Sequence, residues 1–420
     1  MKNYIPRLIE NAIEERMRLF GAVCVQGTKW CGKSTTSKRF ANTVIDLGLQ
    51  PTLEKYKILV SSNSDSLFKG EKPILLDEWQ KIPALWELIK TEVDQTDAIG
   101  DFIITGSATP SEDKERHSGL GRITRLTMRP MSLWESGESS GQISLKDLFE
   151  GKHEIGGDSK LPFDKIPFVI CRGGWPRTVS LGGNESLKFA RIFYNDLTEH
   201  DISSVDDISR NPERARKIMK SYSRNISTLA SNRTIKQNVT ANDDTLDDKT
   251  LSSYTNALRK VFVIEDVEAW SPSLRSKSAI RSSAKRQLVD PSLAAAALSA
   301  TPDDLMDDFR TLGFLFESLC TRDLRIYAEK MDGKIFHYND ENGLEVDAII
   351  KLDNDDWGAV EIKLGGDQID EAAANLLKFK NMVNTEKMKE PKFLMILTGI
   401  DYGYRRPDGV LVVPIGCLKD

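Results

Sequence analysis

A glycine-containing stretch near the amino terminus has the residue types and spacing that bind phosphate groups. Gly27–Ser34 reads Gly-Thr-Lys-Trp-Cys-Gly-Lys-Ser. The glycines let the backbone curl so that its N–H groups face an anion, and the following helix adds the positive end of its dipole. We expect Lys33 to reach the β- and γ-phosphates of a nucleotide and Ser34 to hold Mg²⁺. The predicted phosphate-binding residues are Gly27, Thr28, Lys29, Trp30, Cys31, Gly32, Lys33, Ser34 and Thr35.

Acidic and small polar residues end two later apolar runs. Pro73–Asp77 is followed by Glu78, and Phe102–Thr105 is followed closely by Ser107. Open α/β sheets bind ligands at the carboxyl ends of their strands. Asp77 would therefore complete the magnesium shell, and Glu78 would be the base that polarises the attacking water. Ser107 would sense the γ-phosphate, or else take an ordinary helix-cap or turn role.

Phosphoryl transfer also uses a cation that stabilises the transition state, on the order of 10³–10⁵ in rate where an arginine finger supplies it. The candidates are Arg116, Arg122, Arg125 and Arg129. Arg122 is preferred because it lies in a glycine-rich loop that follows the Phe102–Thr105 run. The alternative for Arg122 is a surface arginine without a catalytic role.

A second group of carboxylates, with a lysine, lies near the carboxyl terminus. Asp347 falls in the predicted strand Leu344–Leu352, and Glu361 and Lys363 fall in the next, Trp357–Leu364. Residues i and i+2 of a strand share a face, and neighbouring strands are ~4.8 Å apart, so the three side chains can meet. The carboxylates could hold Mg²⁺ while Lys363 orients or activates water. A solvated strand face would look the same.

The elements that must position the first group are those of a parallel α/β sheet. Apolar runs alternate with helical stretches over the first third of the chain, which is typical of this fold class. A helix from Lys33 to about Asn42 follows the phosphate loop, and Tyr4–Leu19 is a predicted surface helix. The predicted strands are Ala22–Gln26, Thr43–Leu47, Pro73–Asp77, Phe102–Thr105 and, at an edge, Ile123–Arg129.

The middle of the chain is basic. Residues 210–286 hold 16 Lys and Arg against 8 Asp and Glu, a net charge of +8. Because the whole chain has a net charge of −5, the remaining residues have a net charge of −13. Helical stretches followed by the strand-like run Val261–Val267 are typical of a winged helix. Phosphate contacts are expected from Arg214, Arg216, Lys217, Lys220, Arg224, Arg233 and Lys236.

Asp248–Lys260 would then be a recognition helix that contacts DNA. Its candidate contact residues are Thr250, Ser252, Ser253, Tyr254, Asn256 and Arg259. The alternatives are a solvated helical face and a winged helix used for protein docking.

Taken together, the motifs resemble prokaryotic AAA-superfamily ATPases with a C-terminal domain of unknown function. The resemblance covers nearly the whole chain. It is carried by Gly27–Ser34, Leu75–Gln80, Ile104–Thr109, Gly121-Arg122, Met128–Glu135, Cys171–Pro176, Phe316-Glu317, Glu345–Ile349 and Glu361–Lys363. It implies ATP and Mg²⁺ as cofactors, a winged-helix-like module and a restriction-endonuclease-like C-terminal fold.

The last part of the chain resembles the core of PD-(D/E)xK nucleases in its order of helix, three strands, helix and strand. In that fold a carboxylate on the preceding helix completes the metal site. The resemblance therefore implies that Glu317 joins Asp347 and Glu361 around the metal, with Lys363 beside them.

Composition is that of a soluble multidomain protein. The chain has 420 residues, of which 40% are hydrophobic and 29% charged, which excludes wholesale disorder. No apolar run approaches the ~18–20 residues that span a bilayer, and the amino terminus lacks a secretory signal. Five scattered cysteines and four histidines predict neither disulfides nor a zinc site. We expect a cytoplasmic protein without a membrane partner.

The expected architecture is an α/β multidomain chain. Residues 1–184 would form the AAA-type P-loop ATPase domain with a lid-like segment, 185–300 the helical winged-helix-like module, and 301–420 the nuclease-like domain. The leading hypothesis is a Mg²⁺-dependent ATPase that acts on or at DNA, with metal-dependent cleavage by the last domain. The alternative is a nucleotide-switched signalling or scaffold protein whose C-terminal domain binds a protein partner without catalysis. Either is compatible with a homo-oligomer.

Overall fold

The computed structural model describes residues 4–62, 66–108, 119–206, 208–240, 246–271, 283–383 and 388–420. Arg116, a candidate transition-state cation, lies outside the described residues. The chain forms two compact units. Unit 1 comprises Met1–Pro130, Glu199–Arg210 and Thr255–Val263, and unit 2 comprises Met131–Thr198, Asn211–Tyr254 and Ile264–Asp420.

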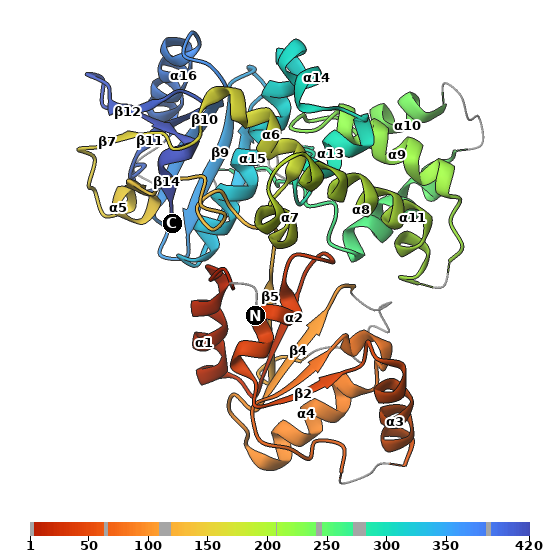
Figure 1. Cartoon of the computed structure of the whole chain (residues 1–420). Helices are drawn as coiled ribbons and strands as arrows, with labels where there is room; N and C mark the ends of the chain where they lie inside the picture. The colour runs from red at the N-terminus through yellow and green to blue at the C-terminus, as the bar shows by residue number, and fades with distance from the viewer. Residues whose placement is uncertain are drawn as a thin grey trace. The chain divides into compact units, whose positions relative to one another are not determined.

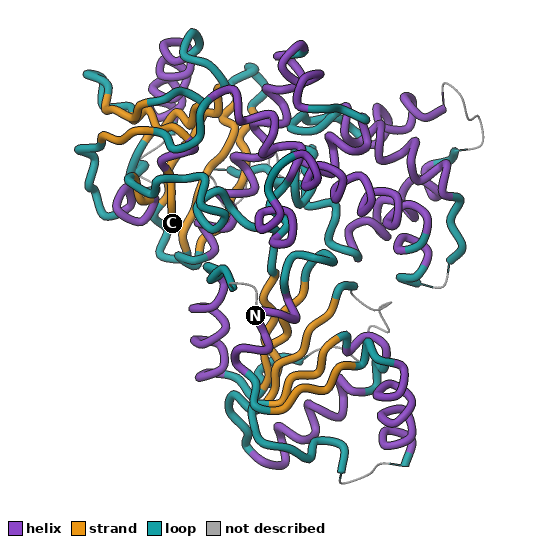
Figure 2. The backbone as a smooth tube through the Cα atoms, in the orientation of Figure 1, coloured by secondary structure: helices purple, strands orange, loops and turns teal. Residues whose placement is uncertain are grey.

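Unit 1 is built on a five-stranded sheet in which every neighbouring pair is parallel, as predicted. The strand order is β2-β3-β4-β1-β5, so β5 lies at an edge (Figures 1 and 2). The strands are β1 (Ala22–Gln26), β2 (Thr43–Asp46), β3 (Ile74–Asp77), β4 (Phe102–Gly106) and β5 (Ile123–Thr127). In register, Asp77 lies beside Thr105, which brings the carboxyl ends of β3 and β4 together.

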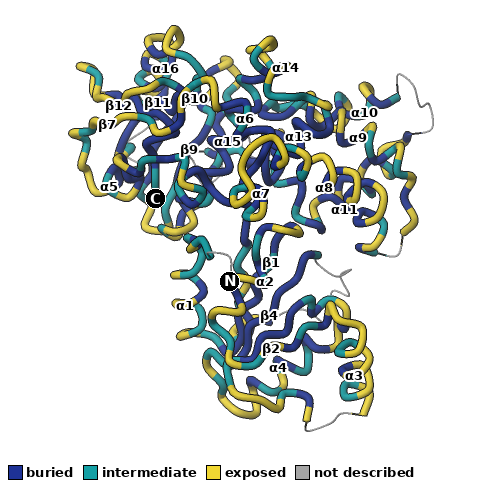
Figure 3. Tube along the Cα trace, in the orientation of Figure 1, coloured by how far each residue is buried: buried dark blue, intermediate teal, exposed yellow. Residues whose placement is uncertain are grey.

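Alternating side chains of this sheet fill two cores. Ala22, Cys24 and Ile104 pack with Trp86 and other residues of one cluster. Val23, Val25 and Ile103 pack in a second cluster that contains Ile13. The period of two along each strand explains why both faces of the central strands β1, β3 and β4 are apolar and buried, whereas the edge strands β2 and β5 are partly exposed (Figure 3). The helices are α1 (Ile9–Leu19), α2 (Lys33–Ser37), α3 (Gln50–Ser61) and α4 (Leu85–Thr96).

Helix α2 is shorter than predicted. It ends at Ser37 and continues as a 3₁₀ turn over Lys38–Phe40. Four of its five residues are Ser or Thr, whose side chains compete with the backbone for hydrogen bonds and disfavour long helices.

Unit 2 contains a seven-stranded mixed sheet in the order β7-β12-β13-β11-β10-β9-β8. Strand β9 is antiparallel to both neighbours, whereas β10, β11 and β13 run parallel. The strands are β7 (Gly156–Asp158), β8 (Gly333–Asn339), β9 (Glu345–Leu352), β10 (Trp357–Lys363), β11 (Leu394–Thr398), β12 (Tyr402–Arg405) and β13 (Leu411–Pro414). The predicted strands Leu344–Leu352 and Trp357–Leu364 are confirmed as β9 and β10. A short pair, β6 (Ile143–Ser144) and β14 (Leu418–Lys419), lies apart from this sheet.

Two long helices flank these C-terminal strands in the chain: α15 (Phe309–Glu329) precedes β8, and α16 (Ile369–Met382) follows β10. Helix α16 packs its Leu376 and Phe379 with Trp357 and Ile396 of the sheet. Shorter helices of unit 2 are α5 (Leu145–Phe149), α6 (Ile166–Arg172), α7 (Pro176–Leu181), α13 (Pro291–Leu298) and α14 (Pro302–Asp307).

The middle of the chain is helical, with a short antiparallel pairing at its end. Its helices are α8 (Leu187–Glu199), α9 (Pro212–Arg224), α10 (Asn232–Thr240) and α11 (Asp248–Lys260). Ile264 then pairs with Leu288, and Val267 with Lys285. We call residues 264–267 together with 285–288 the paired segment. Among the helices that the structure describes, none is long and apolar enough to cross a membrane.

Candidate functional site

The predicted phosphate loop connects β1 to α2 and has the backbone that its glycines allow. Gly27 and Gly32 have φ of 146° and 107°, and Trp30 between them has φ of 66°. A Cβ on Gly27 would lie 2.1 Å from the carbonyl oxygen of Met128, so that position accepts glycine alone. The N–H groups at the start of α2 are thus available to an anion.

Lys33, Ser34 and Asp77 meet at this loop. The Lys33 side chain is buried, and its Nζ donates to the carbonyl oxygen of Thr28 at 2.8 Å. The Ser34 hydroxyl donates to Asp77 Oδ1 at 2.7 Å, and the Thr105 hydroxyl donates to the same oxygen. A hydroxyl and a carboxylate beside a phosphate loop fit Mg²⁺, which binds through one or two protein groups, phosphates and water.

Glu78 lies next to this pair. Its φ of 62° places it at the turn after β3. The Oε2 atom of Glu78 accepts from the Ser107 hydroxyl at 3.1 Å and from the side-chain amide of Gln80. The structure thus brings Ser107 together with the predicted base. Gln80 was missed, although its position two residues after Glu78 in the turn Trp79–Lys81 was a usable signal.

Arg7 is a second residue that sequence reasoning missed. Its guanidinium is buried and donates to the carbonyl oxygens of Cys31 at 2.7 Å and Arg129 at 2.8 Å. It therefore ties the phosphate loop to the backbone just after β5. Lys29 of the same loop pairs with Asp201 at 2.5 Å. Arg7 carried no signal because it fell within Tyr4–Leu19, which was predicted as an ordinary surface helix; the helix itself begins only at Ile9.

Arg122 does not lie where the sequence analysis expected a transition-state cation. It directly precedes β5, and its carbonyl accepts from the N–H of Ala22 at the start of β1. The amino ends of parallel strands lie at the edge opposite the phosphate loop. The Arg122 Nε donates to Asp94 Oδ1 at 2.6 Å, and the two side chains are 43% and 50% exposed. In this chain Arg122 forms an ion pair with Asp94 at the surface and does not reach the phosphate loop of the same chain.

The predicted carboxylates and lysine of unit 2 do converge. Lys363 Nζ lies 2.8 Å from Glu361 Oε2 and 3.4 Å from Asp347 Oδ2. Asp347 Oδ2 also accepts from the Ile362 N–H at 2.9 Å. Strand pairing between β9 and β10 produces this cluster, as the strand spacing predicted.

A further cation, Lys285, occupies the centre of the cluster. Its Nζ lies 2.7 Å from Glu317 Oε1 of α15 and 3.0 Å from Asp347 Oδ1. Asn375 of α16 donates its amide to Glu361 Oε1 at 2.6 Å. Each carboxylate is therefore already bonded to a lysine, and Glu361 to an amide as well.

This arrangement does not fit a divalent cation. Within the described ranges, no three His, Cys, Asp or Glu side chains are arranged to hold a metal ion. Glu317, Asp347 and Glu361 were predicted to hold Mg²⁺, and that prediction did not include Lys285, which pairs with the first two. No signal near these residues indicated a lysine 62 positions before Asp347 in the chain.

Burial and the lysines move the pKa values of these acids in different directions. Burial raises the pKa of Glu317 to about 7 and, with Asp347 nearby, that of Glu361 to about 8. Burial would also raise the pKa of Asp347, but Lys285 and Lys363 hold it well below its usual range. Asp347 is thus the anion that both lysines share.

The basic middle exposes less charge than its sequence suggested. Arg210 is buried against Asp206, Arg286 is buried against Asp266, and Lys285 is buried in the cluster above. On α9 the exposed cations are Lys217, Lys220 and Arg224, and Arg233 is exposed on α10. Lys236 pairs with Asp248 at 2.9 Å.

Tyr254 is also not a surface residue. It is 5% exposed, and its hydroxyl accepts from the N–H of Asn211 at 2.8 Å. Of the predicted recognition-helix residues, Ser252, Asn256 and Arg259 are exposed. Tyr254 is therefore removed from the residues that could contact a base.

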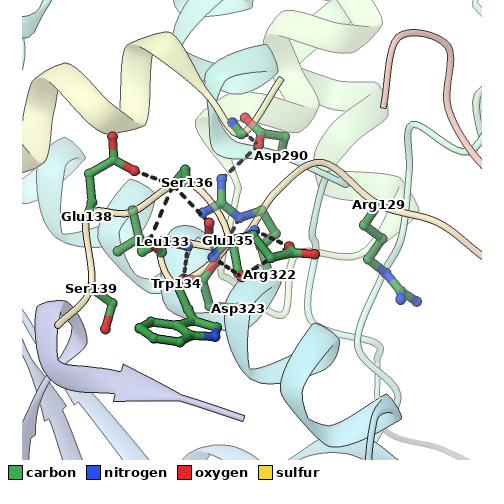
Figure 4. Close-up of polar contacts among 12 residues, drawn as sticks. Arg129, Leu133, Trp134, Glu135, Ser136, Glu138, Ser139, Asp290, Arg322 and Asp323 are labelled. Atoms are coloured by element: carbon green, nitrogen blue, oxygen red, sulfur yellow. Dashed lines mark hydrogen bonds and ion pairs between the residues drawn. The ribbon is translucent and has the colours of Figure 1, made fainter. Parts of the chain in front are cut away.

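Two segments that carried the family resemblance meet at a buried ion-pair hub in unit 2 (Figure 4). Arg322 of α15 bonds Asp290 at 2.9 Å and Asp323 at 2.7 Å, and its side chain is 2% exposed. Asp323 accepts from the N–H of Leu133, and Asp290 accepts from the N–H of Gly174, each at 2.9 Å. The hub thus fixes segments 131–135 and 171–176 to the helix that carries Glu317.

Comparison with known proteins agrees with the phosphate site. Residues 20–136 match the family model of an AAA domain. Residues 164–304 and 312–418 match two domains of unknown function, DUF8612 and DUF4143. With the parallel sheet and loop geometry, the first match supports a P-loop, AAA-like domain over residues 20–136. A search of curated proteins gave no match.

Two solved structures share weak likeness. The Walker-type ATPase PABY2304 of Pyrococcus abyssi is 13% identical, with 70% of this chain and 96% of that chain covered, at a TM-score of 0.43. The replication initiator DnaA bound to AMPPCP and single-stranded DNA is 15% identical, with 60% and 85% covered, at a TM-score of 0.26. Scores this low do not establish a common fold.

Proposed function

We propose that unit 1 binds ATP with Mg²⁺ and hydrolyses it. The supporting observation is that Lys33, Ser34, Asp77 and Glu78 meet at one phosphate loop in an AAA-type domain. Lys33 would bind the β- and γ-phosphates, and Ser34, next to Asp77, would hold the metal. Mg²⁺ bound with the nucleotide supplies charge that neutralises phosphate oxygens. Glu78, oriented by Ser107 and Gln80, would take the proton from the attacking water.

ATP turnover and nucleotide binding test this proposal. Lys33→Ala should lose nucleotide binding, because the buried ammonium in the phosphate loop would bind the β- and γ-phosphates. Glu78→Gln should still bind ATP but turn over more slowly by roughly 10²–10⁴, the usual contribution of a general base. Arg122→Ala is the matched control and should keep turnover within about twofold, since Arg122 pairs with Asp94 at the opposite edge. Equal turnover in Glu78→Gln and wild type would refute the assignment of the base.

We infer that the nucleotide site works together with DNA binding by the middle of the chain. Three consecutive helices, α9 to α11, followed by an antiparallel pairing have the order of a winged helix, which supports this role. Exposed Lys217, Lys220 and Arg224 could contact phosphates. The buried cations Arg210 and Arg286 have no part in it.

The C-terminal domain has the strand order of the nuclease core but not an open metal site. Strands β8-β9-β10-β11-β13 are adjacent, and β9 alone among them is antiparallel. This order supports the proposed restriction-endonuclease-like fold. With Lys285 between Glu317 and Asp347, we assign no cleavage step to the observed arrangement.

A second candidate function is a nucleotide-switched scaffold whose C-terminal domain binds a partner without catalysis. The ion pairs of Lys285 favour it, because they neutralise the residues that would otherwise bind metal. ATP turnover measured with and without DNA, with DNA integrity read in the same tube, separates the candidates. Turnover stimulated by DNA supports the first, and DNA-independent turnover with intact DNA supports the second.

A further inference from the structure

We propose that the Lys285 ammonium is a built-in cation that closes the carboxylate cluster of unit 2 to divalent metals, and that withdrawing it creates a metal site. The proposed nuclease-like fold matters to this inference only for the chemistry that a metal bound at the opened site would perform. Its evidence and its test concern metal binding alone, so ATP hydrolysis can fail or hold independently.

The Lys285 ammonium lies between two carboxylates that a divalent metal would need as ligands. It bonds one oxygen of Glu317 and one of Asp347, at 2.7 and 3.0 Å, and thereby joins α15 to β9. A divalent ion would have to bind these same two carboxylates. Two cations cannot share them at such short range in a buried setting, where repulsion is poorly screened.

The backbone delivers Lys285 to the cluster from a fixed position. Its N–H donates to the Val267 carbonyl, and the Val267 N–H donates to the Lys285 carbonyl, both at 2.9 Å. The next residue, Arg286, donates to the Ala230 carbonyl at 2.7 Å and pairs with Asp266 at 3.2 Å. Lys285 is therefore part of the paired segment, whose backbone hydrogen bonds hold its Cα in place beside the cluster.

The paired segment is continuous with a contact on strand β8. The Trp270 N–H donates to the His337 carbonyl at 2.7 Å, and the His337 N–H donates to the Glu268 carbonyl at 2.9 Å. Trp270 also packs against Trp357, with ring centroids 5.2 Å apart. These contacts link the end of the basic middle directly to the sheet that carries the carboxylates.

The cluster remains reachable from outside. A cavity of about 480 Å³ is lined by Glu317 and Lys363 of the cluster together with Phe163, Phe309, Arg310 and Gln368. A small ion could therefore approach Glu317. The closure is electrostatic, which predicts that removing one charge opens the site without further rearrangement.

Mn²⁺ binding to the full chain without nucleotide, followed by electron paramagnetic resonance, tests the proposal. Wild type should show no Mn²⁺ binding that depends on Asp347. Lys285→Ala should gain a site with at least tenfold higher affinity, and Asp347→Asn in that background should remove it. Mn²⁺ should also raise the melting temperature of Lys285→Ala but not of wild type, because a ligand stabilises the state that binds it. Lys334→Ala, an exposed lysine on β8, is the matched control and should gain nothing.

Loss of Lys285 leaves Glu317 without a cation, whereas Asp347 keeps Lys363 at 3.4 Å. Lys285→Gln is therefore a second variant, which keeps a donor for Glu317. It too should gain Asp347-dependent Mn²⁺ binding. If neither variant folds, the test is Mn²⁺ binding to wild type compared with Asp347→Asn, which should not differ. Asp347-dependent Mn²⁺ binding in wild type, or none in a folded Lys285 variant, would overturn the proposal.

Discussion

At the residue scale, the two predicted acidic sites differ in what surrounds the aspartate. Asp77 accepts from the hydroxyls of Ser34 and Thr105, and its nearest lysine, Lys38, is 3.9 Å away and 44% exposed. Asp347 faces two lysines at 3.0 and 3.4 Å. Neutral donors leave the negative charge of Asp77 available to a metal, whereas the lysines neutralise that of Asp347.

His337 predicts a pH dependence at the same scale. It is fully buried on β8, and its Nε2 lies 3.1 Å from the Ser283 carbonyl. Burial and the charge of Lys285 lower its pKa to about 4, although the Ser283 carbonyl and Asp347 act in the opposite direction. A folded pKa below the unfolded value of about 6.5 means that stability present above pH 6.5 is lost as pH falls toward 4.

The free energy of unfolding should therefore fall by up to about 3 kcal/mol across this window, at about 1.4 kcal/mol per unit of pKa. Urea unfolding followed by tryptophan fluorescence from pH 7.5 to 4.5 measures it. His337→Gln should lose this part of the slope. Glu317 and Glu361, whose raised pKa values act in the opposite sense, remain in both proteins, so the difference between the profiles isolates His337. Superimposable profiles would contradict the prediction.

At the element scale, helix α9 presents its basic residues on one side. Lys217, Lys220 and Arg224 are three and four positions apart, so they share a face, and all are exposed. The opposite face is apolar: Ile218, Met219 and Tyr222 are buried. The helix therefore offers a row of charges anchored to a packed core, which suits binding to a phosphate backbone.

Reversing Lys217, Lys220 and Arg224 to Glu should weaken duplex DNA binding equally for all sequences, because phosphate contacts carry no base information. Affinity of the wild type should fall with salt at a log–log slope of about −0.9 per phosphate contact, and the triple variant should have a shallower slope. Fluorescence anisotropy at several salt concentrations measures both. Reversal of the exposed Lys55, Lys57 and Lys69 is the matched control. Unchanged affinity in the α9 variant would favour a protein-docking role.

At the scale of the whole molecule, each compact unit is assembled from separated stretches of chain. Glu199–Arg210 and Thr255–Val263 belong to unit 1, although the residues between them belong to unit 2. The predicted boundaries near residues 184 and 300 assumed contiguous domains, and they remain predictions for how the chain divides into modules. Within unit 2, the Arg322 hub joins four stretches through Leu133, Gly174, Asp290 and α15.

Arg322→Met should destabilise unit 2 by about 3–5 kcal/mol, because it leaves Asp290 and Asp323 buried without their cation. Both carboxylates are fully buried, and Asp323 also holds the Leu133 N–H. Thermal and urea unfolding measure the loss. Arg405→Ala removes the solvent-exposed pair with Glu154 and should cost no more than about 1 kcal/mol. A loss from Arg322→Met as small as that of the control would mean that water replaces the hub's ion pairs.

The sequence by itself determined what contiguous residues build. The phosphate loop, its flanking strand and helix, and the acids that end β3 follow from glycine conformation, apolar runs and strand direction. The convergence of Asp347, Glu361 and Lys363 follows from the two-residue period and the distance between neighbouring strands. These are local rules, so one stretch of chain is enough to apply them.

Only the tertiary structure decided which distant side chains reach these sites. It placed Lys285 in the carboxylate cluster, Arg7 behind the phosphate loop, Tyr254 in a core, and Arg122 at the sheet edge opposite the phosphate loop. The physical reason is that pairing across long stretches of chain depends on how whole elements pack. Local periodicity gives the face on which a residue lies but not the partner that the face will meet.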